Sequence, residues 1–139
     1  MPKQWPSFAR AAVGLEVRFR RYLAGEHHPQ QAEVDRVAFL ASASESLIGF
    51  VAGHKTKRFG CSGELQWLLV SPEHRDGRVA DKLLHYLVDW FVARGALRVC
   101  VNVEPENIRA RRFYARHGAT SLSEHWMIWD DVRRQLDLT

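Results

Sequence analysis

The chain has 139 residues, of which 46% are hydrophobic, and it carries a net charge of +4 from 20 Lys and Arg against 16 Asp and Glu. A chain of this length can bury roughly two thirds of its unfolded surface, so we expect a single domain that spans residues 1–139. It contains no run of about 18 apolar residues, and the segment from Met1 to Arg10 lacks the apolar core of a secretion signal. These features argue against a membrane or secreted protein, and we expect a cytoplasmic one.

The cysteines and the charge pattern narrow the class of ligand. Cys61 and Cys100 are too few for a disulfide scaffold or a zinc site, and no histidines have ligand-like spacing, so we expect reduced thiols and no metal. The positive excess favours an anionic ligand. The densest basic stretch is clustered at helical rather than linear spacing, whereas a nucleic-acid surface usually shows a basic run interleaved with aromatic residues. It consists of Arg109, Arg111, Arg112 and Arg116. We therefore expect a polyphosphate cofactor and consider a nucleic acid an unlikely partner.

The first half of the chain reads as a helix followed by strands. Between Ser7 and Gly25, apolar residues recur every three or four positions, which predicts an amphipathic helix. Residues 37–41 and 47–52 read as two strands of a hairpin, because a serine-rich turn separates them. Residues 64–70 are almost continuously apolar, which is typical of a strand buried on both faces at the centre of a sheet.

The second half alternates helices and strands. Apolar residues trace one stripe over residues 79–94 and predict a helix that ends before Gly95. Residues 96–103 read as a strand, Asn107 as an N-cap, and residues 108–117 as a helix that Gly118 ends. Two strands follow within residues 119–129. The expected fold is an α/β (α+β) domain with a mixed, mostly antiparallel sheet and helices on both faces.

The turn from Val70 to Ala80 is the most informative segment for function. It connects the expected central strand to the N-terminus of the long helix, where unpaired N–H groups and the positive end of the helix dipole can hold an anion. Arg75 and Arg78 lie in this turn and can add charge-assisted contacts to a phosphate. A pyrophosphate fits such a site, although most strand-turn-helix connections hold only water.

Two motifs in this order resemble those of the GNAT superfamily of N-acetyltransferases. The phosphate loop of that family is Gln or Arg, two variable residues, Gly, one variable residue and then Gly or Ala, and Arg75, Val79 and Ala80 fit it. The segment from Asn107 to Ala119 is similar to the family's Asn, Ala, Phe-Tyr and Gly spacing at a later helix. The resemblance spans roughly residues 37–129. It implies a GNAT-like sheet and the use of acetyl-CoA.

The chain departs from the family pattern at two places. The central glycine of the loop is replaced by Arg78, while Gly77 lies one position earlier. The side chain of Arg78 could obstruct the phosphates or hold one of them. The family also begins with a strand, whereas this chain is expected to open with a helix. The sheet could therefore lack its first strand and expose an edge that a second copy of the chain covers in a homodimer.

The resemblance also implies roles for individual residues. The cofactor-binding set would be Leu69, Val70, Arg75, Asp76, Gly77, Arg78, Val79, Ala80 and Asn107. Tyr114 would protonate the leaving thiolate, and Glu64 matches the glutamate that some members use to deprotonate the amine. Asn107 could instead act only as a helix cap, Tyr114 could be a half-buried aromatic, and Glu64 could be a solvated strand end.

The function that the resemblance implies is transfer of an acetyl group from acetyl-CoA to an amine by direct attack, without a covalent enzyme intermediate. No readable motif identifies the acceptor, which could be a small molecule or a peptide. The alternative is a non-catalytic module of the same fold that binds CoA or a partner protein. Release of free CoA in the presence of an amine would distinguish the two.

Overall fold

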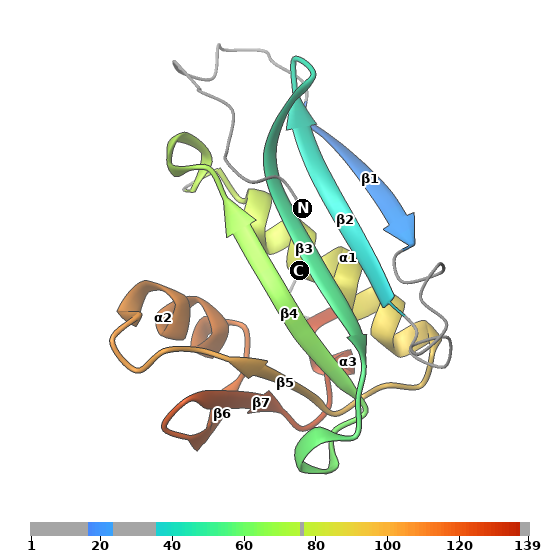
Figure 1. The fold of residues 1–139 in the computed structure, drawn as a ribbon, viewed down its shortest axis with the longest axis vertical. Coiled ribbons are helices and arrows are strands. Elements are labelled where there is room, and N and C mark those ends of the chain that lie inside the picture. Colours follow the sequence, from blue (N-terminus) through green and yellow to red (C-terminus); the bar gives the residue numbers. More distant parts are fainter. Residues whose placement is uncertain (1–16, 24–35, 76, 137–139) are drawn as a thin grey trace.

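The computed structural model describes residues 17–23, 36–75 and 77–136, and it shows a seven-stranded sheet with three helices (Figure 1). In chain order the elements are β1 Val17–Leu23, β2 Arg36–Ala43, β3 Ser46–Lys55, the 3-10 turn η2 Arg58–Gly60, β4 Gly63–Val70, the 3-10 turn η3 Pro72–His74, α1 Val79–Ala93, β5 Val99–Asn102, α2 Ile108–Arg116, β6 Thr120–Ser123, β7 Trp126–Trp129 and α3 Arg133–Leu136.

The strands lie in the order β1-β2-β3-β4-β5-β7-β6, so β4 occupies the centre. Every neighbouring pair is antiparallel except β4 and β5, which run parallel and are joined through α1. This confirms the mixed, mostly antiparallel sheet expected from the sequence. It also confirms the hairpin, the central strand, the long helix and the two closing strands.

The expected helix over residues 7–25 is wrong where the structure describes it. Residues 17–23 form β1, which pairs antiparallel with β2 from Val17 opposite Ala43 to Leu23 opposite Val37. Residues 7–16 lie outside the described part. The helical spacing of apolar residues across the whole segment concealed a shorter alternation of apolar and basic residues, and pairing with β2 selects the strand. The sheet therefore has the strand that was expected to be missing, and the argument for a homodimer at that edge no longer holds.

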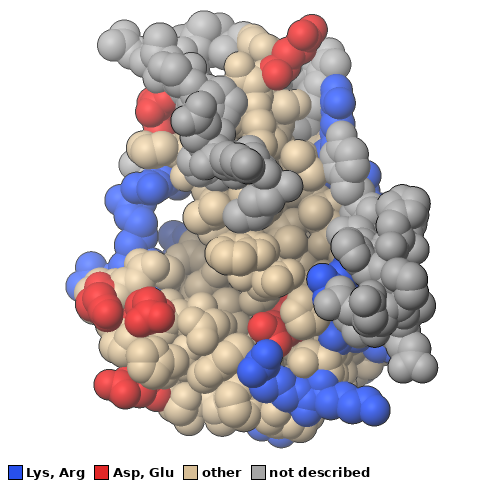
Figure 2. Space-filling model, in the orientation of Figure 1, with Lys and Arg blue, Asp and Glu red and all other residues tan. Residues whose placement is uncertain are grey.

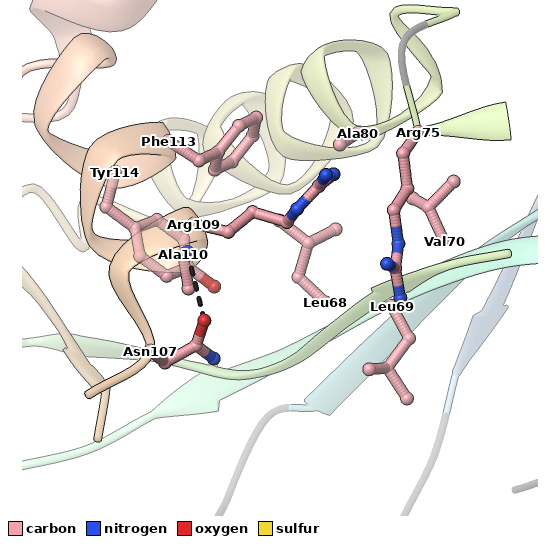
Figure 3. A pocket seen from close by; sticks show the side chains of 10 residues that line it. All are labelled: Leu68, Leu69, Val70, Arg75, Ala80, Asn107, Arg109, Ala110, Phe113 and Tyr114. Atoms are coloured by element: carbon pink, nitrogen blue, oxygen red, sulfur yellow. Dashed lines mark hydrogen bonds between the residues drawn. The ribbon is translucent and has the colours of Figure 1, made fainter. Parts of the chain in front are cut away.

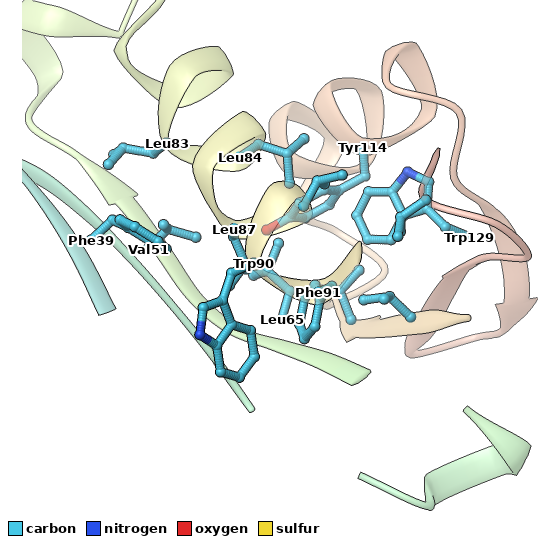
Figure 4. Close-up of a cluster of buried hydrophobic side chains, with 14 of the residues drawn as sticks. Phe39, Val51, Leu65, Leu83, Leu84, Leu87, Trp90, Phe91, Tyr114 and Trp129 are labelled. Atoms are coloured by element: carbon cyan, nitrogen blue, oxygen red, sulfur yellow. The ribbon is translucent and has the colours of Figure 1, made fainter. Parts of the chain in front are cut away.

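Helix α1 packs closely on the sheet because glycines remove side chains beneath it. A Cβ on Gly63 would lie 2.6 Å from a ring carbon of Phe91, and one on Gly53 would lie 2.8 Å from Leu87. These helix residues are almost fully buried in the main core, which also includes Leu83, Leu84 and Val51 (Figure 4). The glycines thus let the helix axis approach the strands, and α1 holds a fixed position relative to β4.

The other two helices lie on the same side of the sheet as α1. Helix α3 packs against α1, while Tyr114 of α2 belongs to the main core. His117, the C-cap of α2, reaches Asp81 in the first turn of α1, with Nε2 at 2.7 Å from Oδ1. No helix covers the opposite face among the described residues, so the expected helix there stays a prediction.

The two parallel strands at the centre separate after three paired positions. Gly63, Glu64 and Leu65 of β4 face Val99, Cys100 and Val101 of β5, and no later pair joins the two strands. In Figure 1, β4 continues beside β3 while β5 turns away towards α2. The second half of β4 therefore has an open edge. Trp67 and Leu69 are also exposed, so β4 is not buried on both faces as the sequence predicted.

Candidate functional site

A cavity of about 330 Å³ lies where the open edge of β4 meets the starts of α1 and α2 (Figure 3). It is lined by Leu68, Leu69, Val70, Arg75, Ala80, Asn107, Arg109, Ala110, Phe113 and Tyr114. Six of these were predicted from the sequence as site residues: Leu69, Val70, Arg75, Ala80, Asn107 and Tyr114. Figure 2 shows a hollow beside β4 that Lys and Arg side chains border. The structure thus brings the two sequence motifs together in one space.

The first turn of α1 provides hydrogen-bond donors at one end of this cavity. No side chain caps the helix N-terminus, and the N-cap residue is Arg78. The N–H groups of the first turn are therefore available to a ligand, and the helix dipole adds positive potential at the same point. Ala80 and Arg75 line the cavity here, so a backbone site for an anion has a guanidinium beside it.

The backbone at Arg78 has a conformation that favours glycine. Arg78 has φ 67° and ψ 14°, which is the left-handed region, whereas Gly77 does not have a positive φ. The glycine of this chain therefore lies beside the position that needs it. The side chain of Arg78 is 78% exposed and its Nε lies 3.7 Å from Oδ2 of Asp81, so it points into solvent and does not line the cavity.

The open edge of β4 supplies further donors, and the sheet register identifies them. The N–H of Ser71 donates to the carbonyl of Ile48 on β3, and the Leu69 carbonyl also faces β3, close to Gly49. Because successive residues of a strand direct their backbone groups to opposite edges, those of Leu68 and Val70 face the cavity. Of the expected pair, Val70 therefore presents its amide, and Leu68 is the second donor that the sequence did not reveal.

Asn107 caps α2, as the sequence predicted. Its Oδ1 accepts a hydrogen bond from the N–H of Ala110 at 3.2 Å. The side-chain amide group is left on the side of the cavity (Figure 3). Asn107 can therefore cap the helix and donate to a ligand at the same time.

Tyr114 lies two turns further along α2, with its ring buried against the indole of Trp129 at 5.7 Å and its side chain 6% exposed. Burial raises the pKa of the Tyr114 hydroxyl well above its ordinary value of 10.0. Within the described part of the chain, no residue forms a hydrogen bond with this hydroxyl. The phenol is therefore protonated at neutral pH, and its proton is not committed to another acceptor.

Glu64 does not line the cavity and lies on the other face of the sheet. It pairs with Cys100 in the short parallel segment, and the neighbouring cluster on that face contains Cys61, Cys100 and Ile128. The Glu64 side chain is 11% exposed. Its Oε1 accepts a hydrogen bond from Arg58 Nε at 3.0 Å, while Oε2 lies 3.9 Å from His54 Nε2. Glu64 and Tyr114 can approach one reacting group only through the gap between β4 and β5.

The remaining predicted positions do not line the cavity where the structure describes them. Val79 is buried in the core, and Gly77 lies in the turn before α1, while Asp76 lies outside the described residues. The sequence did not assign Phe113 and Ala110 to the site. Their spacing of three residues, starting from Asn107, is the signal that could have identified this face of α2. Arg109 is exposed and also borders the cavity.

Among the described residues, no group of three or more His, Cys, Asp or Glu side chains could hold a metal ion. Within the same part of the chain, no helix has the length and apolar character needed to cross a bilayer.

Comparisons with known proteins were made for both sequence and structure. The sequence model of the Acetyltransferase (GNAT) family matches residues 5–119. No curated protein sequence gave a significant match.

Several solved structures share the fold. One is a protein of Desulfovibrio desulfuricans described as a GNAT-family acetyltransferase, with a TM-score of 0.65 and 16% identity over 84% of this chain and 99% of that one. Ard1 of Thermoplasma volcanium has a TM-score of 0.61 and 20% identity, over 68% of this chain and 70% of that one. The PaiA N-acetyltransferase of Thermoplasma acidophilum was solved in complex with coenzyme A. It has a TM-score of 0.59 and 20% identity, over 73% of this chain and 64% of that one.

Proposed function

The chain belongs to the GNAT acetyltransferase family, and from this premise we propose that it transfers an acetyl group from acetyl-CoA to an amine by direct attack. One observation carries the proposal. A single cavity contains the uncapped start of α1, the open edge of β4 and the buried phenol of Tyr114. An anion site, backbone donors for an oxyanion and a proton donor are the groups that this reaction needs.

The residues of the cavity fit acetyl-CoA. We propose that the amides from Arg75 to Ala80 hold the pyrophosphate, with the Arg75 guanidinium as an additional donor. Arg109, at the opposite side of the cavity, is placed to contact a further phosphate. Asn107 donates to the pantetheine arm, and the edge of β4 at Val70 pairs with its amides. The PaiA N-acetyltransferase of T. acidophilum, which shares this fold, was solved in complex with coenzyme A, and this supports the choice of cofactor.

The mechanism follows from these positions. Acetyl-CoA, when bound, supplies the thioester carbonyl and the leaving thiolate. The N–H group of Leu68 stabilises negative charge on the carbonyl oxygen, because it is a fixed donor at an edge where β5 does not compete for it. Tyr114 donates its proton to the departing sulfur, and Glu64 accepts the proton that the amine loses.

The rival function is a non-catalytic module that binds CoA or a protein. Its support in the sequence was the missing first strand and the residue Arg78. The first strand is present, and Arg78 directs its side chain away from the cavity, so only its left-handed backbone favours this rival. We further propose a single domain and a cytoplasmic location, which the free thiols of Cys61 and Cys100 fit.

The deciding experiment combines binding with turnover. Acetyl-CoA should raise the melting temperature, since it binds only the folded state. A panel of amines, polyamines, amino acids and peptides should then contain an acceptor that releases free thiol above the rate of acetyl-CoA hydrolysis. Thermal stabilisation without release of thiol by any acceptor would favour the non-catalytic module, and the absence of both would reject the cofactor.

A further inference from the structure

A cluster of charged and aromatic side chains lies around Glu64, on the face of the sheet opposite to α1. Arg58 of η2 donates to the Glu64 carboxylate from Nε, and its guanidinium carbon lies 5.0 Å from the centre of the Trp126 ring. Phe59 packs edge-on against the same indole, with ring centres 5.0 Å apart. These contacts fix the position of Arg58 between a carboxylate and an aromatic face.

The contacts use only part of the guanidinium. Nε is occupied by Glu64, whereas the terminal nitrogens have no hydrogen-bond partner among the described residues, and the side chain is 51% exposed. An arginine held in this way presents a planar pair of donors, which matches the two oxygens of a carboxylate. The charge of Glu64 is already balanced by Arg58, so the cluster does not favour a ligand that carries several positive charges.

This cluster adjoins the gap between β4 and β5. Glu64 belongs to the last paired positions of the two strands, and Trp126 pairs with Asn102 at the end of β5. Trp67 follows on β4 and lies on the same face, because its partner on β3 is Ala52, two residues from His54, which faces Glu64. An amine near Glu64 can therefore meet an acetyl group that enters the gap from the cavity on the other face.

Two aromatic side chains in this region are unusually exposed. Trp67 is 45% exposed and Phe59 is 48% exposed. Phe59 also has φ 56°, a left-handed conformation that is uncommon for a bulky residue and often occurs at functional sites. The face is mainly uncharged, with acidic and basic side chains adjoining in its lower part (Figure 2). A ligand with a flat apolar body can pack against an exposed ring of this kind.

We propose that the acetyl acceptor is an α-amino acid with an aromatic side chain; this rests on the proposed function and names its substrate class. Arg58 binds the carboxylate of the amino acid, Glu64 accepts a proton from its amine, and Phe59 and Trp67 contact its ring. Arg58 Nε lies 3.0 Å from the carboxylate of Glu64, so a ligand that contacts both side chains must carry its amine and its carboxylate only a few bonds apart. An α-amino acid has this arrangement.

The reaction balances without a further reactant. The neutral α-amine forms a bond to the acetyl carbon while the bond from that carbon to sulfur breaks. The proton lost by the nitrogen passes to Glu64, and the thiolate takes the proton of Tyr114. The products are an N-acetyl amino acid and free CoA.

Matched acceptors test the two recognition elements separately. Thiol release from acetyl-CoA should give a kcat/KM for tryptophan at least about tenfold above that for tryptamine, which lacks the carboxylate, and above that for alanine, which lacks the ring. Tryptamine or a polyamine as the better acceptor would overturn the proposal. If no amine releases thiol, both the proposed function and the acceptor proposal are refuted. An amine that is turned over while tryptophan is not removes only the acceptor class.

Variants of the cluster provide the second test. Arg58→Gln should raise the KM for tryptophan about tenfold and change that for tryptamine less than about twofold, while Arg133→Gln, on α3, serves as the matched control. Asparagine tolerates a left-handed backbone, so Phe59→Asn removes the ring without adding strain. This variant should raise the KM for tryptophan and leave the increase in melting temperature caused by CoA unchanged. Equal losses for both acceptors in Arg58→Gln would show that Arg58 only supports Glu64, and would overturn the carboxylate assignment.

Discussion

Replacing Arg78 by glycine should change stability and cofactor affinity in opposite directions. A non-glycine residue in the left-handed region is strained by about 1 to 2 kcal/mol, and glycine removes that strain. Glycine also adds about 0.5 to 1 kcal/mol of entropic cost on folding. The ion pair with Asp81 contributes little, because the Arg78 side chain is 78% exposed and Nε lies 3.7 Å from the carboxylate. The free energy of unfolding should therefore rise by roughly 0.5 kcal/mol.

The effect on acetyl-CoA binding depends on what the Arg78 side chain does. In the described structure it points into solvent next to the start of α1, from where it can swing to a bound pyrophosphate. A charge-assisted hydrogen bond to a phosphate contributes roughly 1.5 to 3 kcal/mol, which corresponds to about a 10- to 150-fold loss of affinity in Arg78→Gly. Arg78→Lys should keep much of the affinity, and Arg78→Asn should lose it while tolerating the left-handed backbone.

Two measurements on the same variants check this reasoning. The melting temperature without ligand reports the backbone strain, and an increase of about 1 to 2 °C is expected for Arg78→Gly. Calorimetric titration of acetyl-CoA reports the phosphate contact. Affinity that is unchanged or tighter in Arg78→Gly would refute a phosphate contact, and a lower melting temperature would refute the strain argument.

Four further predictions follow from individual contacts. Tyr114→Phe should lower turnover about a hundredfold or more while CoA affinity and melting temperature change little, which steady-state kinetics and titration would check. Gly63→Ala should cost about 1 to 3 kcal/mol in urea unfolding because its Cβ would lie 2.6 Å from a buried ring, whereas Gly77→Ala, whose Cβ makes an ordinary contact, should be nearly neutral. Burial raises the pKa of Cys100 from 9.0 to about 12. The free energy of unfolding should therefore keep the contribution of the buried thiol below pH 9 and fall above pH 9 by up to about 1.4 kcal/mol per pH unit. Cys100→Ala should reduce this slope. Arg111→Ala should weaken CoA binding although Arg111 does not line the cavity, and unchanged affinity would contradict this.

Much of the fold could be predicted because local patterns and tertiary structure agree. The apolar stripe of α1, the N-cap Asn107 and the glycine after α2 each specify a boundary that the structure reproduces. The first segment could not be predicted in this way, since apolar residues at helical spacing overlap with an alternation of apolar and basic residues from Val17 to Arg20. There the pairing partner decides, and a partner strand 14 or more residues away is not a local signal.

The site was predictable where it depends on sequence spacing and not where it depends on the sheet. Asn107 and Tyr114, seven residues apart, line the same cavity, as two helical turns require. In contrast, the backbone donors at Leu68 and Val70 depend on which edge of β4 faces β3, and this follows only from the register. The position of Glu64 away from the cavity could be seen only in the fold, because the sequence does not show on which face of the sheet a side chain of the central strand lies.

The open edge of β4 exists because β5 is held by other partners. Past Val101, the N–H of Val103 donates to the carbonyl of His125, which continues the pairing with β7 instead of returning to β4. Arg111 of α2 then donates to the carbonyls of Val103, Glu104 and Glu124, so it joins the end of β5 to the β6–β7 turn. These bonds pull β5 away from the centre of the sheet. An arginine that reads as one of several solvated helix charges therefore maintains the gap in which the two faces of the site can meet.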